Sequence, residues 1–419
     1  MTQLKVLISG GGIAGNALAF WLSKLGHDVT VVEWFPNLRT TGLQLDLRGH
    51  GIEVMKRMGL EEDFRSRMAP EQGLQIVNSA GKRRAFFPAN RSGKGLQNFT
   101  TDWEIMRGDL CRLLYDHSKD RTKYIFGASV ESFEEKDNGV EVRLSNGNTD
   151  RYDLLVGADG QGSRTRRMMV GPDNSDGLHP LHGVYIAYFI MPRPKKEDEE
   201  YLATVYTATG RRAMMVRRHS PDKVQVYLMC KNNSEQLKNV RKGDIDEERK
   251  ILAEIFKGAG WQTEEILKSM MTADDFYLEH LGLVKLDSWY RGRIVLLGDA
   301  AYCPTASTGM GTTSAMVGAY VLAGEIGRHC KGTNTKDSLT AALKAYDQKF
   351  RPFMDQVQKG ISEDSGAWGS MMPSTAFGIG VMNFLMAMAA FLKLNIIAEW
   401  FLKEGVKWDL PEYEEILKA

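Results

Sequence analysis

Cysteine is scarce in this sequence, and neither sign of charge dominates. The 419 residues include four cysteines, none in a CxxC or CxxxxC pair: Cys111, Cys230, Cys303 and Cys330. This spacing argues against a disulfide framework, a zinc site and a redox dithiol, and it predicts reduced thiols in a cytoplasmic protein. Lys and Arg number 54 against 53 Asp and Glu, a net charge of +1. The chain therefore lacks the large net positive charge that would favour binding to nucleic acid or to an anionic membrane.

Clustered histidines and apolar runs of bilayer length are also missing. The eight histidines show no ligand spacing, so we predict no metal site and no Ser-His-Asp set. Phe377–Leu392 is nearly all apolar, but as a helix it spans roughly 24 Å against roughly 30 Å for a bilayer core. We expect the segment from Phe377 to Phe401 to pack across a domain junction, so that membrane contact is disfavoured. A helix lying on a membrane surface is the alternative.

Apolar periodicity divides the chain into elements. Residues 4–9 and 28–33 read as strands around a helix at 13–25, a βαβ unit. Helices are predicted at 50–68 and 101–118, followed by a β-meander that ends in a buried strand at "DLLVGADG". The pattern of residues 178–230 predicts a second, mostly antiparallel sheet, and that of 244–272 predicts a helical stretch. A strand is predicted at 292–301, and the chain beyond 310 is predicted to be chiefly helical. The class is α/β with an α+β insertion.

A glycine fingerprint follows the first predicted strand. Gly10, Gly12 and Gly15 match G-x-G-x-x-G between strand and helix, and Glu33 ends the second strand. Glycine permits the tight turn and lets a pyrophosphate approach the helix N-terminus, while the acid accepts ribose hydroxyls. The motif predicts binding of an ADP moiety and leaves NAD and FAD both open.

Two later segments distinguish these cofactors. "GADGQGSRTRR" begins at Gly157, and "GDAAYCPTASTGMGT" begins at Gly298. Small residues allow a flat ligand to approach closely, and the following helix offers N–H groups. In this order the three motifs resemble those of the group A FAD-dependent monooxygenases, the p-hydroxybenzoate hydroxylase family. "TTGLQLDLRGHGIEVMKRMGL" adds a resemblance to the branch that inactivates tetracycline and hydroxylates polyketides.

The resemblance implies a set of FAD contacts. Arg107 reaches the cofactor from the side, Asp159 also bears on nicotinamide use, and Asp46 and Arg48 approach the flavin and the pocket floor. The implied cofactor-binding residues are Gly10, Gly12, Ile13, Ala14, Gly15, Glu33, Asp46, Arg107, Asp159, Asp299, Pro304, Gly309, Met310, Gly311 and Thr312. Local alternatives stay open, since Asp159 and Asp299 could be turn caps and Asp46 and Arg48 a surface ion pair. Tyr302 and Ala306 depart from the pattern, where histidine and a second proline are usual.

The resemblance also implies a division of the chain. A Rossmann-like FAD-binding domain is expected from residues 1–72, 101–175 and 273–360. An inserted antiparallel-sheet substrate domain is expected from 73–100 and 176–272, and C-terminal helices from 361–419.

The implied chemistry belongs to the flavin. NAD(P)H docks transiently and reduces non-covalent FAD, O₂ forms a C4a-hydroperoxide, and the oxygen hydroxylates an aromatic or polycyclic small molecule. No catalytic side chain is required. Candidate pocket residues are Arg48, Tyr206, Arg212, Met215 and Tyr227, with Met214 beside them, although alternation leaves open which face points inward. A flavin-dependent reductase or oxidase of an isoprenoid or polyketide and a non-catalytic FAD-binding protein are the alternatives. The enzyme is expected to be a monomer or homodimer.

Overall fold

A six-stranded sheet forms one half of the protein. The computed structural model describes residues 3–89, 103–241, 243–331, 336–361, 372–392 and 406–417. The sheet has the order β17-β18-β11-β1-β2-β7, and its strands are parallel except for the edge strand β17. The strand bounds are Lys5–Ser9 for β1, Asp28–Glu33 for β2, Thr122–Phe126 for β7, Leu154–Gly157 for β11, Tyr290–Arg291 for β17 and Ile294–Leu296 for β18. The βαβ prediction is confirmed.

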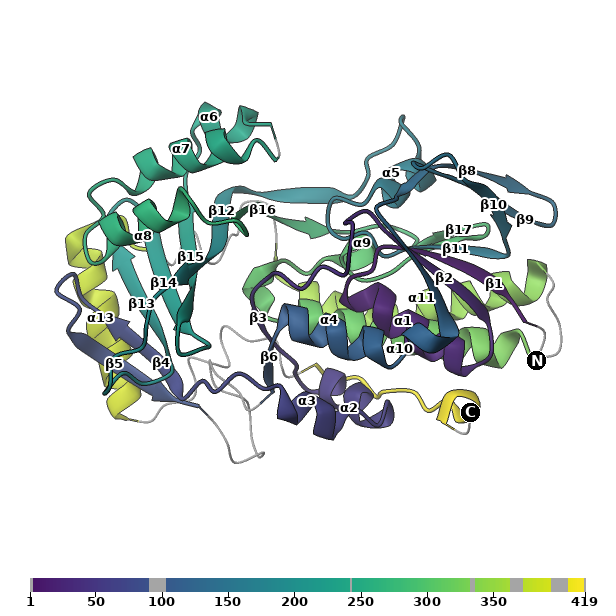
Figure 1. The fold of residues 1–419 in the computed structure, drawn as a ribbon, viewed down its shortest axis with the longest axis horizontal. Coiled ribbons are helices and arrows are strands. Elements are labelled where there is room, and N and C mark those ends of the chain that lie inside the picture. Colours follow the sequence, from purple (N-terminus) through teal and green to yellow (C-terminus); the bar gives the residue numbers. More distant parts are fainter. Residues whose placement is uncertain are drawn as a thin grey trace.

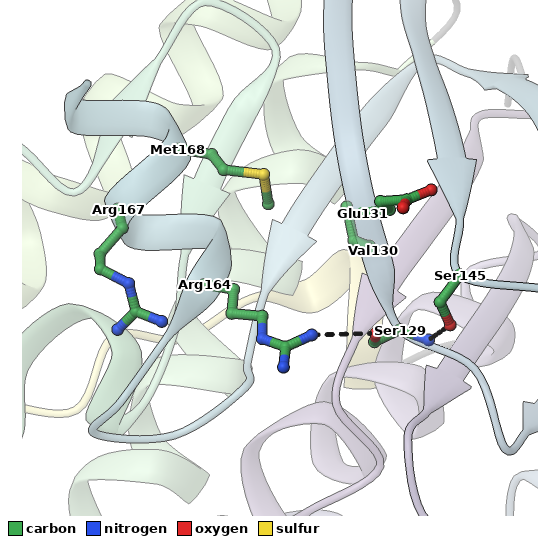
Figure 2. Close-up of a pocket in the computed structure, with 7 residues that line it drawn as sticks. All are labelled: Ser129, Val130, Glu131, Ser145, Arg164, Arg167 and Met168. Atoms are coloured by element: carbon green, nitrogen blue, oxygen red, sulfur yellow. Dashed lines mark hydrogen bonds between the residues drawn. The ribbon is translucent and has the colours of Figure 1, made fainter. Parts of the chain in front are cut away.

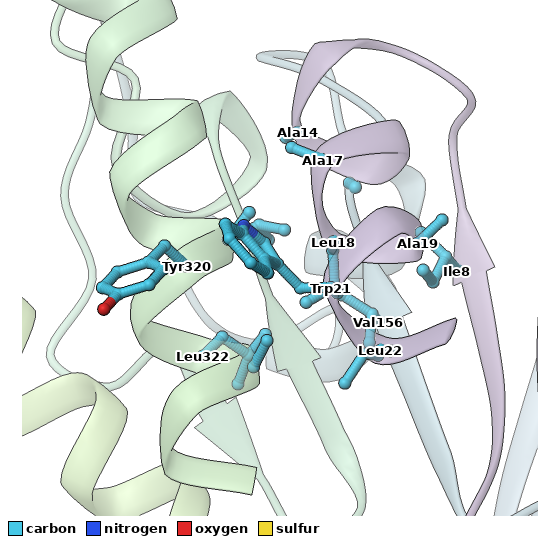
Figure 3. Packing of buried hydrophobic residues seen from close by; sticks show 14 of the residues in the cluster. Ile8, Ala14, Ala17, Leu18, Ala19, Trp21, Leu22, Val156, Tyr320 and Leu322 are labelled. Carbon is cyan, nitrogen blue, oxygen red and sulfur yellow. The ribbon is translucent and has the colours of Figure 1, made fainter. Parts of the chain in front are cut away.

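Helices cover one face of this sheet (Figure 1). They include α1 (Ile13–Lys24), α4 (Arg107–Asp116), α10 (Gly311–His329) and α11 (Lys336–Gln358). The ring of Trp21 on α1 lies edge-on to that of Tyr320 on α10, with 5.4 Å between centroids, inside the largest buried core (Figure 3). The predicted meander is the three-stranded sheet β8 (Val130–Lys136), β9 (Gly139–Leu144) and β10 (Thr149–Tyr152).

Several predicted elements are shorter than expected or divided. The helix predicted at 50–68 is two helices, α2 (His50–Arg57) and α3 (Glu61–Ser66), because Gly59 between them has φ of 74°. Residues Glu104–Met106, predicted as helical, form strand β6, which pairs with β3 (Gln44–Asp46), so α4 begins only at Arg107. The strand predicted at 292–301 ends at Leu296, and a short helix α9 (Asp299–Tyr302) follows.

A seven-stranded sheet forms the other half. Its order is β16-β12-β15-β14-β13-β4-β5, antiparallel except between β13 and β4. The strand bounds are Gly73–Val77 for β4, Arg83–Pro88 for β5, Leu178–Pro192 for β12, Leu202–Ala208 for β13, Arg212–Arg218 for β14, Lys223–Lys231 for β15 and Tyr277–Val284 for β16. The helical stretch predicted at 244–272 is α7 (Ile245–Phe256) and α8 (Thr263–Met270), preceded by α6 (Glu235–Asn239). Residues of α7 and α8 pack on one face of the sheet, so the other face is directed toward the six-stranded sheet (Figure 1).

The apolar C-terminal helix does not lie across the junction. Helix α13 (Ala376–Phe391) packs against β5 and β13, at the end of the seven-stranded sheet far from the six-stranded one (Figure 1). The predicted position is therefore wrong, and only Ala389 of this helix is buried. A stripe of large apolar side chains is exposed: Phe377, Val381, Phe384, Leu385, Met388 and Phe391. The predicted continuation to Phe401 lies outside the described residues. A four-residue helix, α15 (Glu414–Leu417), closes the described chain and packs on α10.

Replacing Phe384 with serine is expected to change the free energy of unfolding by no more than about 0.5 kcal/mol, because its side chain is already in contact with solvent. Phe384 is 65% exposed, whereas Phe350 in the main core is fully buried. The matched change Phe350→Ser should cost about 3–5 kcal/mol. Urea unfolding checks both, and a loss above about 2 kcal/mol for Phe384→Ser would show that this stripe is covered in solution.

Candidate cofactor site

The carboxyl ends of four parallel strands bring the predicted motifs together. Ser9 at the end of β1 is in register with Val32 of β2 and with Gly157 of β11, and Gly157 is in register with Leu296 of β18. The glycine turn, the DG segment and the GD segment therefore begin side by side. In open α/β sheets this edge is where ligands bind.

The three glycines of the fingerprint meet different demands. Gly10 has φ of 112°, and a Cβ there would lie 2.4 Å from the Ala158 oxygen. A Cβ on Gly15 would lie 2.0 Å from the oxygen of Gly10. The fold itself therefore requires both. A Cβ on Gly12 would meet only the Arg107 guanidinium, at 3.6 Å. The space beside Gly12, just before Ile13 and Ala14 open α1, is a cradle into which a pyrophosphate fits.

Glu33 fixes this turn. Its side chain is buried, Oε2 accepts a hydrogen bond from Gly11 N at 2.8 Å, and Oε1 accepts one from Phe35 N at 3.1 Å. A carboxylate has about four lone-pair positions, so these two bonds leave capacity for ribose hydroxyls. The ribose contact stays a prediction.

Two arginines stand beside the cradle. Arg107 is the first residue of α4, and its Nη1 donates to the Thr41 oxygen at 3.3 Å. Arg39 was missed by sequence reasoning, because a single arginine after the second strand carries no distinctive spacing. Burial, and then the nearby Arg107, lower the pKa of Arg39, and within the described chain its buried Nε has no hydrogen-bond partner. Two close guanidinium groups, one with a free buried donor, suit an anionic group such as the FAD pyrophosphate.

Asp159 acts locally as a cap. Its Oδ2 accepts from the backbone N of Arg164 at 2.9 Å and of Thr165 at 3.0 Å, at the start of α5 (Arg164–Val170). Arg166, fully buried on α5, donates to the oxygens of Ala300 at 3.1 Å and Gln161 at 2.7 Å. The DG segment is thereby tied to the GD segment. The contacts match the turn-cap alternative, and the FAD role of Asp159 stays a prediction.

The GD segment places Asp299 at the first residue of α9. Burial raises the pKa of this carboxyl, and Arg107 lowers it in part. The loop from Pro304 leads through Gly309, with φ of 64°, to Met310, Gly311 and Thr312 at the start of α10. These residues are brought to the edge that holds the glycine turn, since a Cβ on Gly298 would lie 2.8 Å from the Ala14 Cβ.

One departure in this loop, Tyr302, has a packing explanation. The Tyr302 ring is buried, and its hydroxyl lies 3.2 Å from that of Tyr346, so a tyrosine here serves the core. Burial raises the pKa of Cys303 well above its ordinary value, and its Sγ donates to the Gly282 oxygen at 3.5 Å. A redox thiolate at Cys303 is therefore disfavoured.

Asp46 and Arg48 lie at the start of α10. The Arg48 guanidinium, almost fully buried, is paired with Asp46 through Nε at 2.5 Å. The backbone N of Arg48 donates to Thr313 Oγ1 at 3.0 Å. The ion-pair alternative is therefore found, but Arg48 is buried while Asp46 is 23% exposed, and the pair adjoins the loop before α10.

The candidate pocket residues are divided between two faces of the seven-stranded sheet. Met215 and Tyr227 pack with Tyr188 and with Leu43, which precedes β3, on the face directed toward the six-stranded sheet. We call this the inner face. Arg39 links it to the cofactor edge, because its guanidinium lies 5.6 Å from the ring centroid of Tyr277 on β16.

Tyr206, Arg212 and Met214 are on the opposite face. The Tyr206 hydroxyl donates to the Ala259 oxygen at 2.8 Å, and Arg212 Nη1 donates to the Ile255 oxygen at the end of α7 at 2.8 Å. Met214 lies in the core beneath α7 and α8. Adjacent residues of a strand point to opposite faces, so Met215 and Met214 cannot line one pocket. The structure does not bring Tyr206 and Arg212 to the inner face.

A buried ionic network joins the inner face to the β3–β6 ribbon, and sequence reasoning missed it. Arg217 on β14 donates from Nε to Glu71 Oε2 and from Nη2 to Glu71 Oε1, both at 2.8 Å, and it also bonds Glu104 on β6. Gln44 N donates to Gln225 Oε1 on β15 at 2.6 Å. Burial lowers the pKa of Arg217, but Glu104 and Glu71 raise it well above its ordinary value.

A separate surface cavity lies between α5 and the meander (Figure 2). Arg164 Nη1 donates across it to Ser129 Oγ at 3.4 Å. None of the predicted cofactor residues lines this cavity, so it is not the cofactor site.

The family is decided by the sequence profile of the FAD binding domain, which matches residues 3–360. The chain belongs to this family. It is 50% identical to the FAD-dependent monooxygenase asL4 of Sarocladium schorii, over 100% of both chains, and 41% identical to the flavin-dependent monooxygenase eupH of a Phoma species, over 93% of both. The crystal structure of the tetracycline destructase Tet(51) covers 98% of this chain and 99% of its own, with a TM-score of 0.76 and 29% identity. The protein is thus a group A FAD-dependent monooxygenase, as the three motifs predict.

Neither a metal-ligand cluster nor a bilayer-crossing helix occurs among the described residues. No group of three or more His, Cys, Asp or Glu side chains there could hold a metal ion. Among the helices of the described residues, none combines the length and apolarity that a bilayer crossing needs.

Proposed function

We propose that this FAD-dependent monooxygenase uses NAD(P)H and O₂ to hydroxylate an aromatic or polycyclic small molecule of the polyketide type. When bound, the flavin supplies the redox chemistry: one oxygen atom of O₂ enters the substrate, the other leaves as water, and NAD(P)H provides the two electrons. The chain's own residues bind and orient. The glycine turn, Arg39 and Arg107 would hold the anionic half of FAD, and the GD loop would contact its ring.

The composition of the inner face is the observation that carries the substrate class. Tyr188, Tyr227, Met215 and Ile186 form an aromatic and apolar cluster on the inner face. The rings of Tyr188 and Tyr227 are edge-on, with centroids 5.4 Å apart. Burial raises the pKa of Tyr227 to about 12, against the effect of Arg217, and its hydroxyl donates to Gln225 Oε1 at 3.2 Å. Such a wall fits a planar ligand that carries a few oxygens. The tetracycline destructase, which resembles this chain at 29% identity, is named for a polycyclic substrate.

We also propose that the seven-stranded sheet with its helices is the substrate domain and the six-stranded half the FAD-binding domain. A cytoplasmic location is supported by the four cysteines, which are free and buried in the described chain.

The purified protein is expected to be yellow, with FAD that acid or heat releases completely. Its oxidation of NADPH or NADH should accelerate when a phenolic polyketide or tetracycline is added, and product formed under isotopically labelled O₂ should carry one labelled oxygen. NAD(P)H consumption that leaves no label in the product would favour the reductase or oxidase. If the protein binds FAD but none of these compounds stimulates NAD(P)H oxidation, a non-catalytic FAD-binding protein is favoured.

A further inference from the structure

Thr305 has an unusual backbone in the middle of the cofactor loop. Its φ of 63° and ψ of 148° fall in a region that is almost restricted to glycine. Arg211 and Trp261 are the other non-glycine residues of the described chain with positive φ, at 58° and 51°. Threonine is β-branched, which makes this conformation costly. Strain of this kind persists only where the surroundings impose it, and it is concentrated at functional sites.

The neighbours of Thr305 hold it in place. Its backbone N–H donates to the Cys303 sulfur. Its carbonyl oxygen accepts from Thr308 Oγ1 at 3.0 Å and from Thr308 N at 3.3 Å. The preceding residues are fixed in turn, because Gln358 Nε2 donates to the oxygens of Tyr302 at 3.1 Å and Cys303 at 3.2 Å. Both backbone polar groups of Thr305 are thus occupied.

The side-chain hydroxyl is the remaining polar group of Thr305. The residue is 2% exposed, and its Oγ1 has no hydrogen-bond partner in the described part of the chain. An unsatisfied buried hydroxyl costs about 1–3 kcal/mol. A strained backbone and an unsatisfied hydroxyl at one residue of this loop both have an explanation if a ligand completes the site.

We propose that the Thr305 hydroxyl hydrogen-bonds a polar edge of the isoalloxazine ring of bound FAD, and that the strained backbone serves to direct it there. This inference rests on the FAD site of the proposed function. It adds a ring contact made by a side chain, beside the backbone N–H groups at the start of α10. The loop's neighbours enforce the backbone conformation of Thr305 in the free chain, before the cofactor arrives.

Removal of the hydroxyl tests the proposal. Thr305→Val and Thr305→Ala should weaken FAD binding roughly three- to tenfold, the loss of one neutral hydrogen bond, and should shift the flavin absorption bands and reduction potential. Thr305→Ser keeps the hydroxyl and should restore the wild-type values. If Thr305→Val does not fold, Thr305→Ala gives the same readout. Wild-type affinity and an unchanged spectrum in both would overturn the proposal.

Relief of the backbone strain at Thr305 should raise stability, whereas loss of its hydroxyl should lower FAD affinity. Thr305→Gly should raise the melting temperature measured without added FAD by about 2–4 °C, while its FAD affinity falls as in Thr305→Ala. Arg211→Gly is the matched control, because it relieves a similar φ in the turn between β13 and β14 and should leave FAD affinity unchanged. A Thr305→Gly variant with lowered melting temperature and normal FAD affinity would show a purely structural residue. A wild-type protein that binds no FAD would refute the cofactor site itself.

Discussion

Replacing Arg217 with methionine is expected to destabilise the protein by about 3–5 kcal/mol, because it removes one cation that bonds two buried carboxylates. The side chains of Glu71 and Glu104 are 1% and 2% exposed, and Arg217 contacts both. Arg217 also joins β14 of the seven-stranded sheet to β6, whose partner β3 ends at Asp46, two residues before Arg48. Urea unfolding at saturating FAD, followed by tryptophan fluorescence, measures the loss.

Two controls separate charge from packing in this experiment. The triple variant Arg217→Met, Glu71→Gln, Glu104→Gln removes the uncompensated charge and should recover most of the lost stability. Lys238→Met breaks an exposed pair with Glu235 and should change the stability by no more than about 0.5 kcal/mol. A loss below about 1 kcal/mol for Arg217→Met would mean that water reaches the two carboxylates.

Gly12→Ala is expected to fold normally and to lose FAD. Its Cβ would make only an ordinary 3.6 Å contact with Arg107 in the free chain. The backbone there is extended, with φ of −79° and ψ of −165°, so alanine is not strained. In the complex the same methyl occupies the cradle that the pyrophosphate needs, and the overpacking should weaken FAD binding roughly ten- to 100-fold. Fluorescence titration with FAD measures the affinity, and thermal melting measures the fold.

Substitutions of two other glycines serve as controls for this result. Gly15→Ala would place its Cβ 2.0 Å from the oxygen of Gly10, so it should lower stability and FAD affinity together. Gly380 on α13 has open space around a Cβ, so Gly380→Ala should leave FAD affinity unchanged and should not lower stability, because alanine is the better helix former. If Gly12→Ala binds FAD as tightly as the wild type, the pyrophosphate does not approach this turn.

The sequence by itself determined the cofactor edge. Gly10 follows the apolar run of β1, Gly15 lies in the first turn of α1, and Glu33 ends the apolar run of β2. Neighbouring residues thus meet the backbone requirements of a strand–turn–helix. The resemblance implied that Asp159 and Asp299 contact the same cofactor as the glycine turn, and the parallel strands of the structure end at one edge, which brings the three segments together. Their individual contacts were less predictable, because a carboxylate at a strand end can cap a helix or hold a ligand.

Tertiary structure alone decided what lies opposite that edge. Alternation showed that Met214 and Met215 point to opposite faces, but only the packing of α7 and α8 determined that Met215 and Tyr227 are inward while Tyr206 and Arg212 are beneath the helices. The Arg217 network draws on residues 71, 104 and 217, whose separation leaves no local pattern. The position of α13 was also undetermined, since an evenly apolar helix fits any apolar surface. Burial depends on which surfaces meet, and a sequence records local geometry far more directly than it records those long-range contacts.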